Sequence, residues 1–119
     1  MDNIKADRPW GSYEVLKHTD KYWIKLLTIR PLQKLSLQSH ENRDERWVVI
    51  SGEGVAEVDD EKGILEQGTN IYVPRQTKHR IYNISKTDEL LVCEVANGDC
   101  DESDIVRYSD EFGRATEQQ

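Results

Sequence analysis

Long apolar runs, a regular helical repeat and an excess of positive charge are all missing from this sequence of 119 residues. No stretch approaches the roughly 18 consecutive apolar residues that a membrane-spanning helix requires. The first twenty residues also lack the apolar segment of a signal peptide. We therefore expect no membrane association and a cytoplasmic location. Cys93 lies in an apolar run and Cys100 in an acidic turn, and in a reducing compartment we expect both to be free thiols.

The charge balance argues against partners that carry many negative charges. Sixteen Lys and Arg residues stand against 23 Asp and Glu residues, which gives a net charge of -7 at pH 7. A chain of this sign repels nucleic-acid backbones and anionic lipid surfaces, so we expect neither as a partner. The length and the 36% hydrophobic content suffice for one modest core. The sequence therefore predicts a single domain over residues 1–119.

Short β-rich runs separated by turn residues make up most of the chain, and no apolar period of 3.6 residues is sustained. Many short strands separated by Gly, Pro, Asp and Asn are typical of a sandwich or a small barrel. We expect an all-β core over about residues 10–100 and a C-terminal segment over 101–119, in which only 101–112 could form a helical turn. The predicted strands span residues 12–17, 21–30, 34–40, 46–51, 55–59, 63–66, 70–74, 79–85 and 89–96.

Two polar segments place possible metal ligands at spacings that suit strands. In the first segment Gln38 and His40 are two residues apart, and Glu45 follows after four further residues. In the second segment His79 begins a predicted strand. Residues two apart in a strand share a face, so Gln38 and His40 point the same way. Glu45 and His79 each share the parity of inward apolar neighbours, and we predict that all four converge inside a barrel.

The chemistry of these four side chains predicts one divalent metal ion. Two imidazoles, one carboxylate and one amide oxygen suit a first-row ion with coordination positions left for water or substrate. The set does not discriminate among Zn, Mn, Fe, Co and Ni. Alternatively, the four side chains only form hydrogen bonds in a polar barrel mouth. That alternative is disfavoured because a carboxylate and two imidazoles are costly to desolvate inside a small core.

The same segments resemble the two signature motifs of the cupin family. The segment KLSLQSHENRDERWVVISGEG at 34–54 has Gln38 where most cupins have a first histidine, and residues 68–83 match the second motif. The Gln-x-His variant, RPWGSYEVL at 8–16 and ESDIVRYSDEFGR at 102–114 are similar to the C-terminal cupin domain of type II mannose-6-phosphate isomerase/mannose-1-phosphate guanylyltransferase. The resemblance implies a single cupin barrel, that is, a double-stranded β-helix or jelly roll.

The resemblance also implies an activity, the metal-dependent interconversion of mannose 6-phosphate and fructose 6-phosphate through an enediol. In this interpretation either Glu45 or a metal-bound hydroxide is the base, and Arg43 matches the arginine of the family's isomerase motif. Candidate phosphate ligands are Lys25, Arg75 and Arg80, of which Lys25 shares an otherwise apolar strand face. Guanylyltransferase activity is predicted to be absent, because no nucleotide-binding domain with a Gly-rich loop is present.

One departure from the family pattern keeps two other functions open. The family usually has a histidine after the glutamate, and this chain has Arg46, which stays protonated and cannot transfer a proton. A non-catalytic, metal-containing cupin that binds sugar phosphate is therefore the alternative to an isomerase. Another metal-dependent cupin enzyme, such as an oxygenase, would more typically carry His-x-His. By analogy with small cupins we expect a homodimer, paired through an exposed edge strand at 12–17.

Overall fold

The computed structural model describes residues 4–109, and every regular element among them is a β-strand. The strands form two antiparallel sheets, a six-stranded sheet in the order β1-β2-β3-β10-β5-β8 and a five-stranded sheet in the order β11-β4-β9-β6-β7. The bounds are β1 Ile4–Arg8, β2 Gly11–His18, β3 Tyr22–Ile29, β4 Leu37–Ser39, β5 Arg43–Ser51, β6 Gly54–Val58, β7 Glu61–Leu65, β8 Asn70–Val73, β9 His79–Asn83, β10 Leu90–Gly98 and β11 Val106–Ser109.

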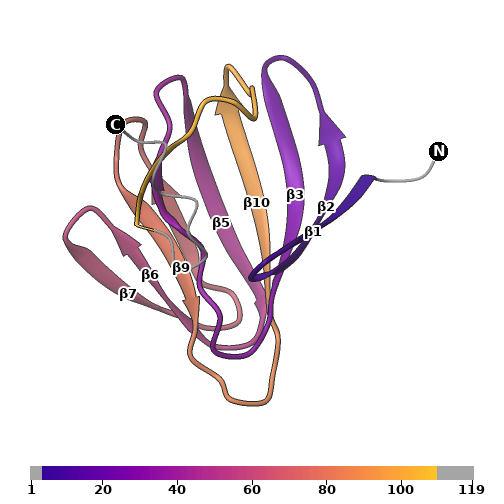
Figure 1. Ribbon diagram of the computed structural model, residues 1–119, viewed down its shortest axis with the longest axis vertical. Helices are drawn as coiled ribbons and strands as arrows, with labels where there is room; N and C mark the ends of the chain where they lie inside the picture. Colours follow the sequence, from indigo (N-terminus) through magenta and orange to yellow (C-terminus); the bar gives the residue numbers. More distant parts are fainter. Residues whose placement is uncertain (1–3, 110–119) are drawn as a thin grey trace.

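The two sheets face each other and come together at one end, as Figure 1 shows for β3, β10 and β5 on one side and β6, β7 and β9 on the other. This two-sheet arrangement confirms the prediction of an all-β fold. Both cysteines are free thiols, as expected. The described residues contain no helix long and apolar enough to cross a membrane. The single domain over 1–119 stays a prediction, and residues 110–119 of its C-terminal segment lie outside the described part.

Two strands were not predicted, and each changes an expectation. The segment 101–112, which the sequence left open to a helical turn, has a hydrogen-bonded turn at 101–104 and then continues as β11, which pairs with β4. Residues 4–8 form β1, which pairs along β2. The segment 12–17 is therefore covered on both sides and cannot be the free edge proposed for a dimer. The homodimer itself stays a prediction.

The space between the sheets has an apolar end and a charged end. Strict alternation along β3, β5 and β10 turns every second residue inward. At one end Leu27, Val49 and Val92 lie in neighbouring register and pack in the core. Further along the same strands four of the inward positions are charged, and all four are buried: Lys25, Arg43, Glu45 and Glu94. Buried charges gathered on one side of a core indicate a functional site, because burial of a charge is costly unless it has partners.

Gly98 allows β10 and β5 to approach each other beside this charged end. It pairs with Arg43 and has a φ of 124°, and a Cβ atom would lie 2.3 Å from the carbonyl oxygen of Asn42. We expect Gly98→Ala to lower the free energy of unfolding by about 2–4 kcal/mol, through the strained backbone and the steric clash. Chemical denaturation measures this loss. Gly63→Ala is the control, because its Cβ would meet only Ile71 Cδ1 at 3.8 Å; equal losses in the two variants would contradict this account.

Candidate metal centre

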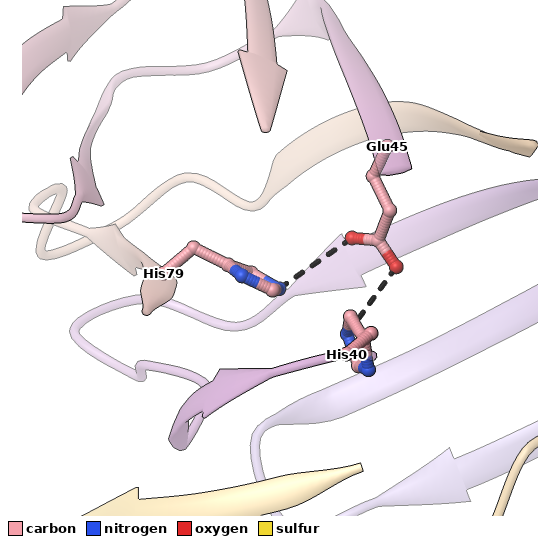
Figure 2. Close-up of side chains that lie close together, drawn as sticks. All are labelled: His40, Glu45 and His79. Atoms are coloured by element: carbon pink, nitrogen blue, oxygen red, sulfur yellow. Dashed lines mark ion pairs between the residues drawn. The ribbon is translucent and has the colours of Figure 1, made fainter. Parts of the chain in front are cut away.

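Three of the predicted ligands converge between the sheets. Glu45 lies on β5, His79 begins β9 and His40 directly follows β4, and all three side chains are buried. Figure 2 shows both imidazoles turned toward the carboxylate. The Nε2 atom of His40 lies 3.4 Å from Glu45 Oε2, and the Nε2 atom of His79 lies 3.6 Å from Glu45 Oε1. The three potential ligand atoms all lie within 4.8 Å of one another, which is a spacing that one ion can bridge.

The hydrogen bonds of the two imidazoles leave the correct nitrogen for a metal. His40 Nδ1 lies 2.6 Å from the carbonyl oxygen of Asp104, and His79 Nδ1 lies 2.9 Å from the carbonyl oxygen of Thr77. A carbonyl oxygen only accepts hydrogen bonds, so each Nδ1 carries the proton and donates it. Each Nε2 therefore presents a lone pair toward Glu45. Metal-binding histidines are commonly held in this way by a partner on the second ring nitrogen.

The protonation states also fit a metal centre. Burial, together with the positive charge of Arg43 and the proximity of His79, lowers the pKa of His40 to about 3. Burial likewise lowers the pKa of His79 below its ordinary value. Both imidazoles are therefore neutral near pH 7, which is the form that binds a metal ion.

Gln38 lies next to this group through a cross-strand pair. It is opposite His79 in the register of β4 and β9. The side-chain nitrogen of Gln38 donates to Ser36 Oγ at 3.0 Å, which leaves the amide oxygen to act as an acceptor or a ligand. The residues present thus suit a divalent ion, with two imidazole nitrogens, one carboxylate and one adjacent amide oxygen.

Arg43 reaches into the same group from β5. Only 5% of this residue is exposed, and its Nε donates to Glu45 Oε2 at 3.0 Å. One terminal nitrogen donates to the carbonyl oxygen of Asp101 at 3.0 Å, and the other lies 3.2 Å from His40 Nε2. The guanidinium therefore contacts two of the three converging ligands and is held by backbone on its other side.

A cavity of about 190 Å³ opens beside Glu45 and Gln38. Its wall is rich in charge and in aromatic rings, a composition that suits a polar small molecule with a negative group. The basic lining residues are Arg8, Lys25, Arg43 and Arg107, the acidic ones are Glu45, Glu94 and Glu102, and the aromatic ones are Trp10, Tyr13 and Trp23.

The three predicted phosphate ligands are not brought together. Lys25 lines the cavity. Arg80 follows His79 on β9, stacks on the ring of Tyr82 and lies 3.7 Å from Glu57. Arg75 is exposed after β8, and neither Arg75 nor Arg80 lines the cavity.

Two other arginines line the cavity instead, and the sequence interpretation missed both. Arg8 ends β1 and Arg107 lies on β11, beside Gln38 in the register. Both belong to the two strands that were not predicted. Each lies within a segment of the family resemblance, at 8–16 and 102–114, and this was the signal available in the sequence.

Glu94 is another cavity residue that the sequence interpretation missed. It lies on β10, where its two oxygens accept the indole N–H groups of Trp23 and Trp47 at 3.0 and 3.2 Å. Burial, followed by the negative charge of Glu45, raises the pKa of Glu94 to about 7. The available signal was a lone carboxylate inside the apolar run LLVCEVA at 90–96, at a position with inward parity.

Arg46, which replaces a histidine of the family pattern, lies outside the site. Arg46 is exposed while its neighbour Glu45 is buried, and its guanidinium stacks on the ring of Tyr72. Alternation along β5 therefore turns this position away from the cavity, as the sequence predicts.

Known proteins resemble the chain over nearly its whole length. A family model described as "Mannose-6-phosphate isomerase C-terminal" matches residues 2–110. The mannose-1-phosphate guanylyltransferase of Escherichia coli (strain K12) is 36% identical over 127 residues, covering 96% of this chain and 26% of that protein. The alginate biosynthesis protein AlgA of Pseudomonas aeruginosa is 37% identical over 118 residues, covering 98% of this chain and 24% of that protein. The chain thus spans about a quarter of the length of these relatives.

Solved structures support the fold. KdgF from Halomonas sp. superposes with a TM-score of 0.74 at 19% identity, covering 87% of this chain and 91% of that chain. Rru_A2000 from Rhodospirillum rubrum, described as a cupin-2 domain, superposes with a TM-score of 0.73 at 14% identity, covering 86% of this chain and 78% of that chain. At these identities the likeness shows the fold alone, and it confirms the predicted cupin fold.

The relatives correct one expectation from the sequence. The prediction that guanylyltransferase activity is absent does not stand, because a protein named for that activity matches 96% of this chain. The prediction depended on the length of the chain and the lack of a nucleotide-binding domain. A chain that spans about a quarter of such relatives gives no ground for excluding the activity.

Proposed function

Because the chain belongs to the family of mannose-6-phosphate isomerase C-terminal domains, we propose that it is a metal-dependent isomerase of sugar phosphates. The proposed reaction interconverts mannose 6-phosphate and fructose 6-phosphate. The observation that carries the proposal is the convergence of His40 Nε2, His79 Nε2 and the Glu45 carboxylate beside a cavity with several cations. The family and its relatives belong to sugar-phosphate metabolism, which supports a small phosphorylated sugar as the ligand.

His40, Glu45 and His79, with Gln38 beside them, would hold one divalent ion. When bound, such an ion polarises carbonyl and hydroxyl oxygens and stabilises the negative charge that develops on them. Arg43 contacts both Glu45 and His40, so its guanidinium lies where it can donate hydrogen bonds to the same oxygens. The reaction requires an electrophile next to the oxygens of the enediolate, and the Arg43 guanidinium adds to the one that an ion would supply.

The reaction also requires a base that moves a proton between adjacent carbons. Breaking the C2–H bond of the aldose leaves its electron pair in a C1–C2 double bond, and the electron pair of the C1 carbonyl moves onto O1. Transfer of the O2 hydroxyl proton to O1, with re-formation of the carbonyl at C2, and return of the carbon-bound proton to C1 complete the ketose. Three carboxylates line the cavity, and Glu102 is paired with Lys25 at 2.9 Å, which leaves Glu45 and Glu94 as the candidates. A carboxylate that binds a metal ion is a weak base, because the ion shares its electrons. We therefore assign the proton transfer to Glu94, which the indoles of Trp23 and Trp47 hold in place, and metal binding to Glu45.

A non-catalytic sugar-phosphate-binding cupin remains the second candidate, because Arg46 replaces a histidine of the family pattern. The outward direction of Arg46 reduces the weight of this departure. A side chain that stacks on Tyr72 on the exposed face does not reach the cavity. The cavity itself retains Glu94 and Arg43, and the metal-binding group lies beside it.

A coupled assay for fructose 6-phosphate formation tests the proposal. The chain is stripped of metal, and Zn, Mn, Fe, Co and Ni ions are restored one at a time with mannose 6-phosphate as substrate. We expect turnover with at least one ion and none without metal. If the chain binds an ion and mannose 6-phosphate but no ion gives turnover, the isomerase proposal fails and the binding function replaces it.

A further inference from the structure

We infer that Arg8, Tyr13 and Lys25 form a seat for the phosphate group of the ligand, and that Glu102 fills this seat in the free protein. The identity of the ligand rests on the proposed function, whereas the seat itself requires only an anion. These four residues all line the cavity. Three of them come from the first three strands, and Glu102 comes from the connection between β10 and β11.

Both oxygens of the Glu102 carboxylate are held by the seat. Lys25 Nζ donates to Glu102 Oε1 at 2.9 Å, and the Tyr13 hydroxyl donates to Glu102 Oε2 at 3.3 Å. Arg8 donates to the Tyr13 hydroxyl oxygen at 2.9 Å and so orients that hydroxyl toward the carboxylate. A carboxylate held by an ammonium and a hydroxyl occupies the place that a phosphate oxygen would take.

Lys25 requires an anion at this place. The residue is 5% exposed, and its Nζ lies 3.6 Å from the centroid of a Trp23 ring and 4.5 Å from that of the Tyr13 ring. A buried ammonium without an anion is strongly destabilising. Burial alone would raise the pKa of Glu102, but the charge and hydrogen bond of Lys25, the charge of Arg43 and the hydrogen bond from Tyr13 together hold it below its ordinary value. Glu102 therefore stays charged and neutralises Lys25 until another anion replaces it.

The charge of the seat matches a phosphate better than a carboxylate. Lys25 and Arg8 bring two positive charges, and Glu102 brings one negative charge. A phosphate monoester carries about -1.5 to -2 charges at pH 7 and has three acceptor oxygens. Replacement of Glu102 by such a group would neutralise both cations and give Arg8 a direct acceptor.

The side chain of Glu102 is exposed enough to leave the seat, whereas Lys25 is held in place by burial. The Glu102 side chain is 52% exposed, although Lys25, its partner on β3, is buried. The connection that carries Glu102 has two other anchors. The carbonyl oxygen of Asp101 accepts from Arg43, and the carboxylate of Asp104 accepts the backbone N–H of Glu41 at 2.9 Å. The side chain of Glu102 can therefore turn outward while the connection stays attached on both sides.

The seat and the metal-binding group share one wall of the cavity. The Arg43 guanidinium lies 4.1 Å from the centroid of a Trp23 ring, and Lys25 stacks on the same side chain. Arg43 in turn contacts Glu45. A ligand that spans this wall has an anionic group at one end and oxygens at the other, as a hexose phosphate does.

Phosphate binding by a Glu102→Gln variant tests the inference. Titration calorimetry on the metal-loaded full chain would use inorganic phosphate, mannose 6-phosphate and unphosphorylated mannose as probes. We expect Glu102→Gln to bind the two phosphate probes about tenfold more tightly than the original chain, and Lys25→Met about tenfold more weakly. Mannose affinity should not change in either variant. Glu61→Gln is the matched control, because it removes one exposed negative charge from β7, outside the cavity.

Unchanged or weaker phosphate binding by Glu102→Gln would overturn the inference. An equal increase of phosphate affinity in the Glu61→Gln control would overturn it as well. Thermal unfolding of Lys25→Met verifies that its loss of binding is not a loss of fold. The inference and the proposed function fail separately. If Glu102→Gln tightens phosphate binding but no variant turns over sugar, the seat stands and the isomerase proposal fails. If turnover occurs but neither variant changes phosphate affinity, the isomerase proposal stands and the seat fails.

Discussion

His79→Ala is expected to lower the affinity of the chain for divalent ions by at least about a hundredfold, because it removes one of the converging ligands. His79 Nε2 faces Glu45, and its Nδ1 is fixed by the carbonyl oxygen of Thr77. An alanine there would leave one imidazole and one carboxylate in the buried group. Direct titration of the metal-stripped chain with Zn, Mn or Co ions measures the loss and requires no assumption about activity.

The third histidine of the chain provides the control for this prediction. His18 is exposed at the end of β2, and its Nε2 lies 2.9 Å from the carbonyl oxygen of Cys100. His18→Ala should therefore leave metal affinity unchanged. If His79→Ala retained the affinity of the original chain, or if His18→Ala lost as much, the metal centre would not lie where the structure brings His40, Glu45 and His79 together.

Arg43→Met is expected to lower turnover by about a hundred- to a thousandfold while the chain keeps its metal affinity or gains some. The reason is that Arg43 has two opposite effects at the site. Its guanidinium contacts His40 Nε2 and Glu45 Oε2, so its positive charge and hydrogen bonds compete with an ion for the same atoms. The same guanidinium is the donor that would stabilise the enediolate. Parallel measurements of metal affinity and of kcat separate the two effects.

Arg46→Met is the matched control, because it changes the same residue type on the same strand but on the opposite face. Arg46 stacks on Tyr72 and does not line the cavity, so both metal affinity and kcat should be preserved. Arg43→Lys provides a further comparison. It keeps the charge but loses the planar fork of donors, and we expect its kcat to stay low. Full turnover in Arg43→Met, or metal affinity that falls together with turnover, would contradict this role.

The local sequence pattern predicts correctly which side chains are buried and which are exposed where alternation along a strand determines this. Alternation placed Lys25 on an inward face, turned Arg46 outward and gave Glu45 the parity of buried neighbours, and the structure has all three in these positions. The turn and strand signals likewise located nine of the eleven strands found within residues 4–109.

The remaining features depend on contacts between distant segments, which a local pattern does not contain. Strand β1 is a polar segment whose pairing with β2 could not be predicted from its own alternation. The same is true of β11, which is placed by its pairing with β4. For this reason Arg8 and Arg107, which line the cavity, were not predicted as site residues. Arg80 was predicted as a phosphate ligand, but it stacks on Tyr82 and does not line the cavity.

The most direct measurement of the central claim is to follow mannose 6-phosphate by NMR in D2O with the metal-loaded chain. We expect conversion to fructose 6-phosphate, with deuterium entering the sugar at the carbons between which the proton moves, and neither change in the His79→Ala variant. Recovery of mannose 6-phosphate without conversion and without deuterium, by a chain that still binds one ion, would contradict the claim.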